Sequence, residues 1–203
     1  MSLQTAERAL VEGPAGRIEI LVADPGAVRR GVAIVSHPHS LYGGTMDNKV
    51  VQTLAKACQS AGFVAVRFNF RGVGASDGVY DDGRGEREDL LAVEKHARSL
   101  YPDGDLVLAG FSFGGYVAAA AAESLKPSRL VLVAPAVGRF PLGTVAPGAL
   151  VVHGEEDDVV LLRDLLDWAR PQRLPVVVFP GTGHFFHGML APLQNVVSAY
   201  LRR

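Results

Sequence analysis

Ser112 lies between two glycines in the segment 110–114, which reads GFSFG. An apolar run precedes this segment and an alanine-rich run follows it, so the pattern predicts a strand, a sharp turn and a helix. So tight a turn closes only when the residues two before and two after the serine lack side chains, and Gly110 and Gly114 meet that need. The helix would direct free N–H groups and the positive end of its dipole at the serine. We therefore interpret Ser112 as a nucleophile, because the alternative of a capping serine in a glycine-rich turn leaves Gly110 unexplained.

A serine hydroxyl becomes an effective nucleophile when a histidine takes its proton and a carboxylate holds the second nitrogen of that histidine. The chain order serine, acid, histidine is expected on a strand-turn-helix scaffold of this kind. The acids in a predicted strand-end loop are residues 155–158, which read EEDD, and the histidines after them are His184 and His187. His184 is favoured because it follows a strand and a pair of glycines, whereas His187 lies at the start of the last predicted helix. The acidic run lacks the alternating ligand spacing of a calcium loop, which favours a solvated loop with one functional member.

The elements that must position these residues alternate between strand and helix along the chain. Apolar or alternating runs predict strands at residues 17–23, 31–36, 63–68, 106–109, 129–134, 149–153 and 175–179, with the first at an edge of the sheet. Helical spacing predicts helices at residues 47–61, 87–100, 159–169 and 188–201, besides the helix that follows Ser112. This alternation predicts an α/β fold with a mostly parallel, doubly wound sheet, helices on both faces, and the chemistry at the carboxyl ends of the strands.

Composition restricts the possible partners. The chain has 203 residues, of which 48% are hydrophobic and 20% charged, so we expect a single domain spanning residues 1–203. A net charge of -1 gives no electrostatic footprint for nucleic acid or an anionic membrane. The lone cysteine, Cys58, excludes an internal disulfide, and no apolar run approaches the roughly 20 residues of a membrane span. The first eleven residues lack an apolar signal core, so we expect a cytoplasmic protein, with the choice between monomer and homodimer open.

Three segments together resemble the α/β-hydrolase superfamily: GFSFG at 110–114, HGEEDDVV at 153–160 and GTGHFF at 181–186. The second is similar to the family motif H-G-x-x-D-x-V-V, which implies that Asp157 orients the histidine, whereas Asp158 suits an N-cap for the helix predicted from residue 159. The third is similar to G-x-G-H-F, which implies that His184 is the base. The resemblance covers the chain from about Ile18 onward, and it implies an α/β-hydrolase fold.

The segment 37–46, HPHSLYGGTM, resembles the oxyanion loop of small bacterial serine esterases that lack a cap domain and are related to dienelactone hydrolases. An oxyanion hole needs two N–H groups aimed at the place where negative charge develops on the carbonyl oxygen. One is expected from Phe113, the residue after the nucleophile. The resemblance implies His39 as the second donor, with Ser40 and Leu41 as alternatives. Most family members have His-Gly where this chain has His-Pro.

The resemblance also indicates the substrate class. Residues 135–148 are too few for the helical cap that many members insert there, so we expect an open site. Its expected walls are Tyr42, Phe113, Phe140, Phe185 or Phe186, and the loop 71–85. These features predict a serine hydrolase that acts on small-molecule carboxylic esters through an acyl-enzyme, with no cofactor. A thioesterase or a peptidase would use the same parts, and a non-catalytic binding protein on this fold is the alternative of another class.

Three remaining motifs have structural interpretations. The GVG at 72–74 resembles the start of a dinucleotide-binding fingerprint, but the third glycine is missing and no helix is predicted to open there, which favours a tight loop. His37 and His39 lack a third nearby ligand, so no metal site is expected. His153 is expected to tie a strand end through a side-chain hydrogen bond.

Overall fold

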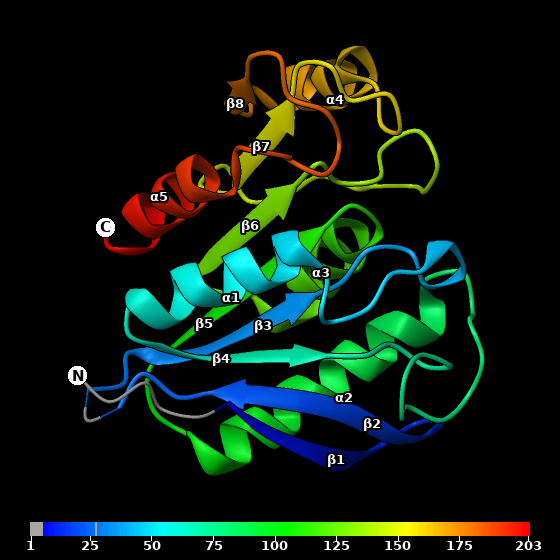
Figure 1. Cartoon of the computed structure of the whole chain (residues 1–203), viewed down its shortest axis with the longest axis vertical. Coiled ribbons are helices and arrows are strands. Elements are labelled where there is room, and N and C mark those ends of the chain that lie inside the picture. The colour runs from blue at the N-terminus through cyan, green and yellow to red at the C-terminus, as the bar shows by residue number, and fades with distance from the viewer. Residues whose placement is uncertain (1–5, 27) are drawn as a thin grey trace.

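A computed structural model describes residues 6–26 and 28–203, and Figure 1 shows its elements. The strands are β1 (Glu7–Gly13), β2 (Gly16–Ala23), β3 (Gly31–Ser36), β4 (Phe63–Phe68), β5 (Asp105–Phe111), β6 (Arg129–Val133), β7 (Leu150–Gly154) and β8 (Val176–Phe179). The helices are α1 (Lys49–Ser60), α2 (Arg84–Leu100), α3 (Phe113–Leu125), α4 (Leu162–Ala169) and α5 (Leu190–Leu201), with short 3₁₀ turns at Ser40–Tyr42 and Arg170–Gln172.

All eight strands form one sheet in the order β1-β2-β4-β3-β5-β6-β7-β8. The pairs from β4 to β8 are parallel, and β1 and β2 are added antiparallel at one edge. Side chains along β3 point alternately to the two faces of the sheet, and both faces are covered by helices. Val32 and Ile34 pack with α2 and α3, whereas Ala33 and Val35 pack with α1 and α5, which explains why the run is continuously apolar. The predicted doubly wound, mostly parallel sheet is therefore confirmed.

Two predicted elements were wrong in their place or limits. The strand at 17–23 is not an edge strand, because β1 pairs along its whole length and forms the edge instead. In β1 only Val11 is buried, so its charged, mostly exposed sequence carries no apolar pattern. The helix predicted from residue 159 begins at Leu162, because the Asp157 carboxylate accepts the N–H groups of Val159 and Val160 and holds them in a turn.

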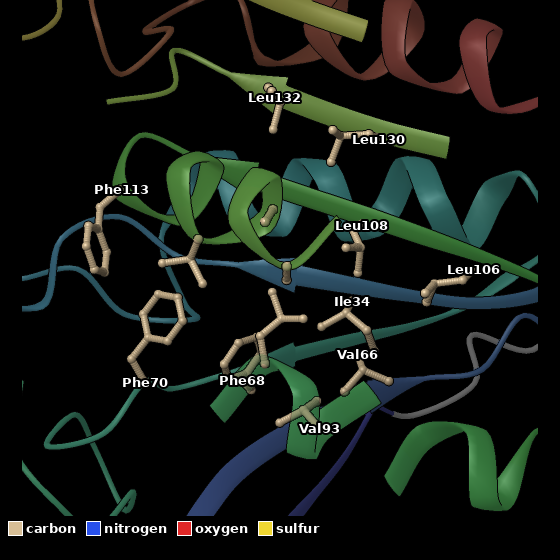
Figure 2. Packing of buried hydrophobic residues seen from close by; sticks show 14 of the residues in the cluster. Ile34, Val66, Phe68, Phe70, Val93, Leu106, Leu108, Phe113, Leu130 and Leu132 are labelled. Atoms are coloured by element: carbon tan, nitrogen blue, oxygen red, sulfur yellow. The ribbon is translucent and has the colours of Figure 1, made fainter. Parts of the chain in front are cut away.

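The core beneath α2 and α3 reaches the carboxyl ends of the strands through aromatic side chains. Figure 2 shows Phe70 and Phe113 together at one end of this cluster, with Leu106 at the other end. The Phe70 and Phe113 rings meet edge to face with centroids 5.6 Å apart, and both side chains are buried. The residue after Ser112 is thus anchored in the core, which fixes the start of α3.

The segment between β6 and β7, residues 134–149, contains no helix and therefore no cap domain. It leaves β6 as an extended loop, with an isolated bridge between Val137 and Phe140. Among the described residues, no helix combines the length and the apolar character needed to cross a membrane.

Candidate active site

Ser112 lies at the junction of β5 and α3 with a strained backbone. Its φ is 55° and its ψ is -119°, a conformation that costs energy for a residue with a side chain. The surrounding chain imposes it: the Ser112 N–H donates to Val133 O at 2.9 Å, and its carbonyl accepts from Gly115 N at 2.9 Å. A methyl group on Gly110 would collide with the Gly114 carbonyl, and one on Gly114 with the Ser36 carbonyl. The spacing of the two glycines therefore has the steric cause inferred from the sequence.

The structure brings Ser112, His184 and Asp157 into one hydrogen-bonded chain. His184 Nε2 is 3.0 Å from Ser112 Oγ, and His184 Nδ1 is 2.7 Å from Asp157 Oδ2. All three side chains are buried, and they come from the carboxyl ends of β5, β7 and β8. In this geometry Nδ1–H donates to the carboxylate, which leaves the Nε2 lone pair facing the serine hydroxyl.

The Asp157 carboxylate accepts three hydrogen bonds. Besides His184, it accepts the N–H of Val159 at 2.9 Å and that of Val160 at 2.7 Å, both on Oδ1. Burial by itself raises the pKa of Asp157, but the hydrogen bonds from His184 and Val160 outweigh it and lower the pKa overall. Asp157 is therefore a stable anion beside the imidazole. Asp158, the neighbouring candidate, is exposed to solvent.

The two other histidines considered near this chain occupy different places. His187 is exposed at the turn before α5. His153 is buried, and its Nε2–H donates to Val160 O at 2.8 Å, which confirms the expected tie at the end of β7. Burial lowers the pKa of His153, so the ring stays neutral 3.6 Å from Asp157 Oδ2. His153 thus supports the turn that carries Asp157.

His37 fixes the start of the loop 37–46. Its Nδ1–H donates to Pro38 O at 2.6 Å, and its Nε2 accepts the Phe70 N–H at 3.0 Å. Full burial lowers the pKa of His37 to about 4, so the ring is neutral and both nitrogens are engaged. His37 in the motif His-Pro-His is therefore a structural histidine. Sequence reasoning predicted that it does not bind a metal, but it did not predict this structural role.

Of the three candidate second donors in this loop, Leu41 is already engaged, because its N–H donates to His39 Nδ1 at 3.3 Å. Within the described part of the chain, the N–H groups of His39 and Phe113 donate no hydrogen bond, and both residues line the pocket that contains Ser112. The structure therefore leaves the amides of His39 and Phe113 without an acceptor, in two residues that line the same pocket as Ser112. Ser40 does not line the pocket.

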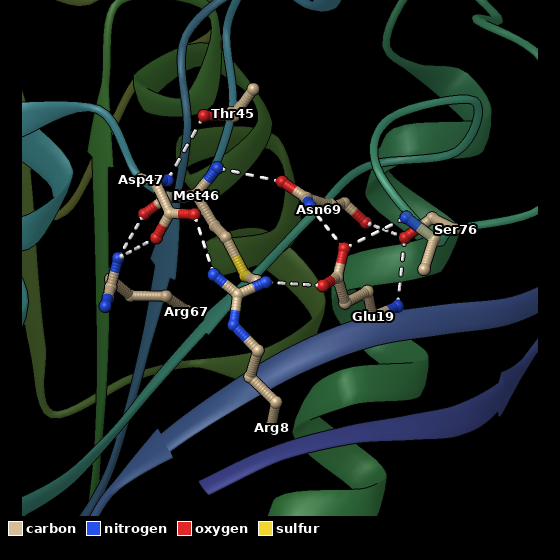
Figure 3. Close-up of polar contacts among 9 residues, drawn as sticks. Arg8, Glu19, Thr45, Met46, Asp47, Arg67, Asn69 and Ser76 are labelled. Atoms are coloured by element: carbon tan, nitrogen blue, oxygen red, sulfur yellow. Dashed lines mark hydrogen bonds and ion pairs between the residues drawn. The ribbon is translucent and has the colours of Figure 1, made fainter. Parts of the chain in front are cut away.

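Asn69 fixes the other end of the loop and was missed by sequence reasoning. Figure 3 shows its side chain between Met46 and Glu19. Asn69 Oδ1 accepts the Met46 N–H at 2.8 Å, and Nδ2 donates to Glu19 Oε2 at 2.7 Å. Glu19 in turn binds Arg8 of β1 at 2.6 Å. The available signal was an amide side chain directly after the apolar run at 63–68, where strand-end polar residues were expected to gather.

Of the glycines in the segment 72–74, Gly74 packs against this polar network. A methyl group on Gly74 would collide with Asn69 Nδ2, and the next residue, Ala75, donates its N–H to Glu19 Oε2 at 3.0 Å. Helix α2 begins only at Arg84, well beyond the glycines. The segment is therefore a tight loop of the kind favoured over a dinucleotide site.

A pocket of about 340 Å³ opens above Ser112, and we call it the Ser112 pocket. Its lining residues are Pro38, His39, Tyr42, Gly43, Gly44, Asn48, Ser112, Phe113, Ala136, Arg139, Phe140, Val159, Val160, His184 and Phe185. Tyr42 and Phe185 form an exposed rim, with 80% and 46% of their surfaces accessible. Of the expected walls, Tyr42, Phe113, Phe140 and Phe185 line the pocket, whereas the alternative Phe186 is buried in the core. The loop 71–85 was wrong as a wall, because none of its residues lines the pocket; Tyr80 contacts His39 instead, with its Oη 3.0 Å from His39 Nε2. A larger hollow of about 890 Å³, between α3 and residues 141–149, contains none of the three hydrogen-bonded residues.

Known proteins are similar to this chain in sequence and in architecture. A family model described as serine aminopeptidase, S33, matches residues 39–147, just over half of the chain. An α/β serine hydrolase without a lid from Xanthomonas campestris is 38% identical, with a TM-score of 0.92 over 100% of this chain and 96% of that one. An α/β serine hydrolase homologue from Coxiella burnetii is 41% identical, with a TM-score of 0.90 over 98% and 99%. An uncharacterised protein from Rickettsia prowazekii is 31% identical over 93% of this chain and 86% of its own length. The chain therefore belongs to the α/β-hydrolase superfamily, and its fold is that of the serine hydrolases without a lid.

Proposed function

We propose that the protein hydrolyses small carboxylic esters, with Ser112 as nucleophile, His184 as general base and acid, and Asp157 as the orienting carboxylate. The observation that carries this proposal is the continuous hydrogen-bonded chain from Ser112 Oγ to Asp157 Oδ2, at the floor of a pocket. The strained Ser112 backbone supports it, because such strain is typical of functional sites.

In the acylation step, His184 Nε2 takes the Ser112 proton while Oγ attacks the carbonyl carbon of the ester. The carbonyl oxygen becomes an oxyanion, and the free N–H groups of Phe113 and His39 would hold it. The Asp157 carboxylate stabilises the imidazolium and keeps the productive tautomer. When the tetrahedral species collapses, His184 gives its proton to the departing alkoxide, and an alcohol and an acyl-Ser112 result.

In the deacylation step, water enters from the open side of the Ser112 pocket. His184 takes a proton from this water, the hydroxide attacks the acyl carbon, and the same two N–H groups hold the second oxyanion. Collapse returns the proton to Ser112 Oγ and releases the carboxylic acid. Besides the ester and water, the cycle uses only groups that the chain itself supplies.

Esters are favoured over aminopeptidase substrates by the charges around the pocket. An aminopeptidase must bind the ammonium group of its substrate, for which a carboxylate beside the serine is the natural partner. The residues that line the Ser112 pocket, all of them described by the structure, include no Asp or Glu and do include Arg139. The thioesterase alternative shares the same geometry, and comparing 4-nitrophenyl esters with acyl thioesters of matched chain length separates the two.

A fluorophosphonate probe tests the proposal most directly. The proposal requires a covalent adduct on Ser112, located by mass spectrometry of the labelled peptide and abolished in Ser112→Ala. Ser99→Ala is the matched control, because Ser99 is an exposed helix residue that bonds only a carbonyl of its own helix, and this variant should label like the wild type. Hydrolysis of 4-nitrophenyl esters of graded acyl length then defines the activity. A folded wild-type protein that neither labels nor turns over any ester would instead be a binding protein on this fold.

A further inference from the structure

The Ser112 pocket combines aromatic walls with one charged residue. Among the lining residues, all described by the structure, Arg139 alone carries a permanent charge. Six others present aromatic rings: His39, Tyr42, Phe113, Phe140, His184 and Phe185. An isolated cation beside apolar surface is expected to attract an anion, because the local dielectric is lower than in bulk water.

The loop that carries Arg139 is fixed to the turn of the nucleophile. The Ala136 N–H donates to Ser112 O at 3.2 Å, and the Phe140 N–H donates to Ala136 O at 3.3 Å. Gly138 takes a φ of 75°, which turns the chain just before Arg139. The backbone of Arg139 therefore keeps a set distance from Ser112, as a residue that selects substrates must.

The Arg139 guanidinium has no carboxylate partner among the described residues. Several other exposed arginines are paired with carboxylates, as Arg84 is with Asp81 and Arg170 with Asp167. The side chain of Arg139 nevertheless lies close to the pocket wall: burial lowers the pKa of His39, and the Arg139 charge lowers it further. Asp82 acts on His39 in the opposite sense but does not line the pocket.

We propose that Arg139 binds a carboxylate on the substrate, so that the preferred esters are anionic. This inference rests on the proposed ester hydrolysis and names the substrate class for the same site. The planar guanidinium offers a pair of parallel N–H donors that match the two oxygens of a carboxylate. The aromatic walls contact the carbon skeleton between that carboxylate and the scissile bond.

Matched pairs of esters test this preference. The 4-nitrophenyl hydrogen esters of succinic, glutaric and adipic acid are compared with the 4-nitrophenyl esters of butanoic, pentanoic and hexanoic acid. A second pair, 4-acetoxybenzoate against phenyl acetate, places the carboxylate on the alcohol side instead. We expect kcat/KM of the wild type to be higher for the anionic member of at least one pair, with a preference that falls as salt is added.

Substitutions then assign the preference to Arg139. Arg139→Gln should lower the anionic-to-neutral ratio of kcat/KM about ten- to a hundredfold, as expected for loss of a charge-assisted hydrogen bond. Arg139→Lys should retain part of the ratio, and Arg139→Glu should invert it. Arg202→Gln is the matched control: it removes one positive charge at the exposed end of α5, and the ratio should stay at the wild-type value. A ratio that is the same in wild type and Arg139→Gln for every pair overturns the proposal.

A binding measurement keeps this test independent of turnover. Calorimetric titration of Ser112→Ala with monomethyl glutarate and with methyl pentanoate compares the anion with its neutral analogue when no chemistry occurs. Tighter binding of monomethyl glutarate that is lost in Ser112→Ala/Arg139→Gln supports the role of Arg139, whatever the labelling of Ser112 shows. Equal binding of the two ligands, or the same difference in both variants, refutes it. Failure of ester hydrolysis itself would be seen separately, as a wild type that does not react with the fluorophosphonate.

Discussion

At the scale of single residues, the two oxygens of Asp157 have different partners. Oδ1 accepts two backbone N–H groups, and Oδ2 accepts the imidazole. An amide in this position would keep its oxygen on the backbone donors and turn its NH₂ toward His184. His184 Nδ1 would then have to accept, and Nε2 would carry the proton that faces Ser112.

Asp157→Asn is therefore expected to reduce kcat about 10³- to 10⁴-fold through the wrong imidazole tautomer. Asp158→Asn should stay within about twofold of the wild type, because that side chain is exposed and outside the chain of hydrogen bonds. Steady-state rates with 4-nitrophenyl butanoate measure both effects. If the two substitutions had the reverse ranking, the acid would be Asp158.

His184→Ala should reduce kcat by several orders of magnitude with a small change in the free energy of unfolding. His187→Ala should change kcat only mildly, since His187 lies exposed outside the Ser112 pocket. Rates with the same ester, together with chemical denaturation of each variant, separate loss of chemistry from loss of fold. Equal losses of rate in both variants would mean that the base is wrongly assigned.

Sequence reasoning at this scale named residues that the structure brings together where chemistry demands a residue type, and it missed residues whose role depends on geometry alone. Ser112, Asp157 and His184 could be named because each is needed for one role and stands in a short motif. Asn69 and the structural role of His37 could not, because their partners are backbone N–H groups of other segments. Main-chain donors leave no trace in the sequence, so the amide of His39 could be named only through the resemblance of the loop 37–46.

At the scale of elements, the turn between β5 and α3 is packed against the end of β3. The α-carbon of Gly114 lies so close to the carbonyls of Ser36 and His37 that a methyl group would overlap both. Ser36 and His37 lead into the loop that ends at Met46 and contains His39, whereas Gly114 directly follows Phe113. The contact between them therefore holds together the two segments that carry the free N–H groups. The glycine is required by the neighbouring strand as well as by the turn.

Gly114→Ala should lower the free energy of unfolding by about 1–3 kcal/mol, as overpacking does, and should reduce kcat further by displacing the loop 37–46. Gly143→Ala is the matched control, because its added methyl group would meet no atom within 4 Å, and its stability should stay close to the wild type. Urea denaturation gives both values. If Gly114→Ala were as stable as the wild type, the carbonyls of Ser36 and His37 would be able to move away from the added methyl group without loss of stability.

The elements that were predicted well are those buried on both faces. The strands β3, β4 and β6 carry uninterrupted apolar runs, and their predicted limits agree with the observed ones to within a residue. The edge strand β1 was missed because its pairing with β2 comes from backbone hydrogen bonds and ion pairs rather than from an apolar face. The start of α4 was misplaced because the Asp157 side chain binds His184 and also accepts the Val160 N–H of its own turn.

At the scale of the whole molecule, buried neutral histidines link stability to pH. Burial lowers the pKa of His37 to about 4 in the folded state, against an ordinary value near 6.5. Between these values the unfolded chain binds a proton that the folded chain does not, so acid favours unfolding. His153, whose pKa burial also lowers, acts in the same direction.

The free energy of unfolding should therefore fall by about 3 kcal/mol on account of His37 as the pH is lowered from 7 to 4. The stabilisation is complete above about pH 6.5 and is lost progressively down to the folded pKa. Denaturation at a series of pH values measures this slope, and His37→Gln, which cannot titrate, should flatten it. His187→Gln, at an exposed histidine, serves as control and should keep the wild-type slope.

The chain between β6 and β7 has a further consequence, because it adds no lid above the serine. An acyl group on Ser112 would remain in contact with bulk solvent throughout its lifetime. Dissolved methanol or hydroxylamine could then compete with water for the same carbonyl carbon. The protein would partition each acyl group between hydrolysis and transfer in proportion to the nucleophiles around it, so the surrounding medium, and not only the protein, would decide which product forms.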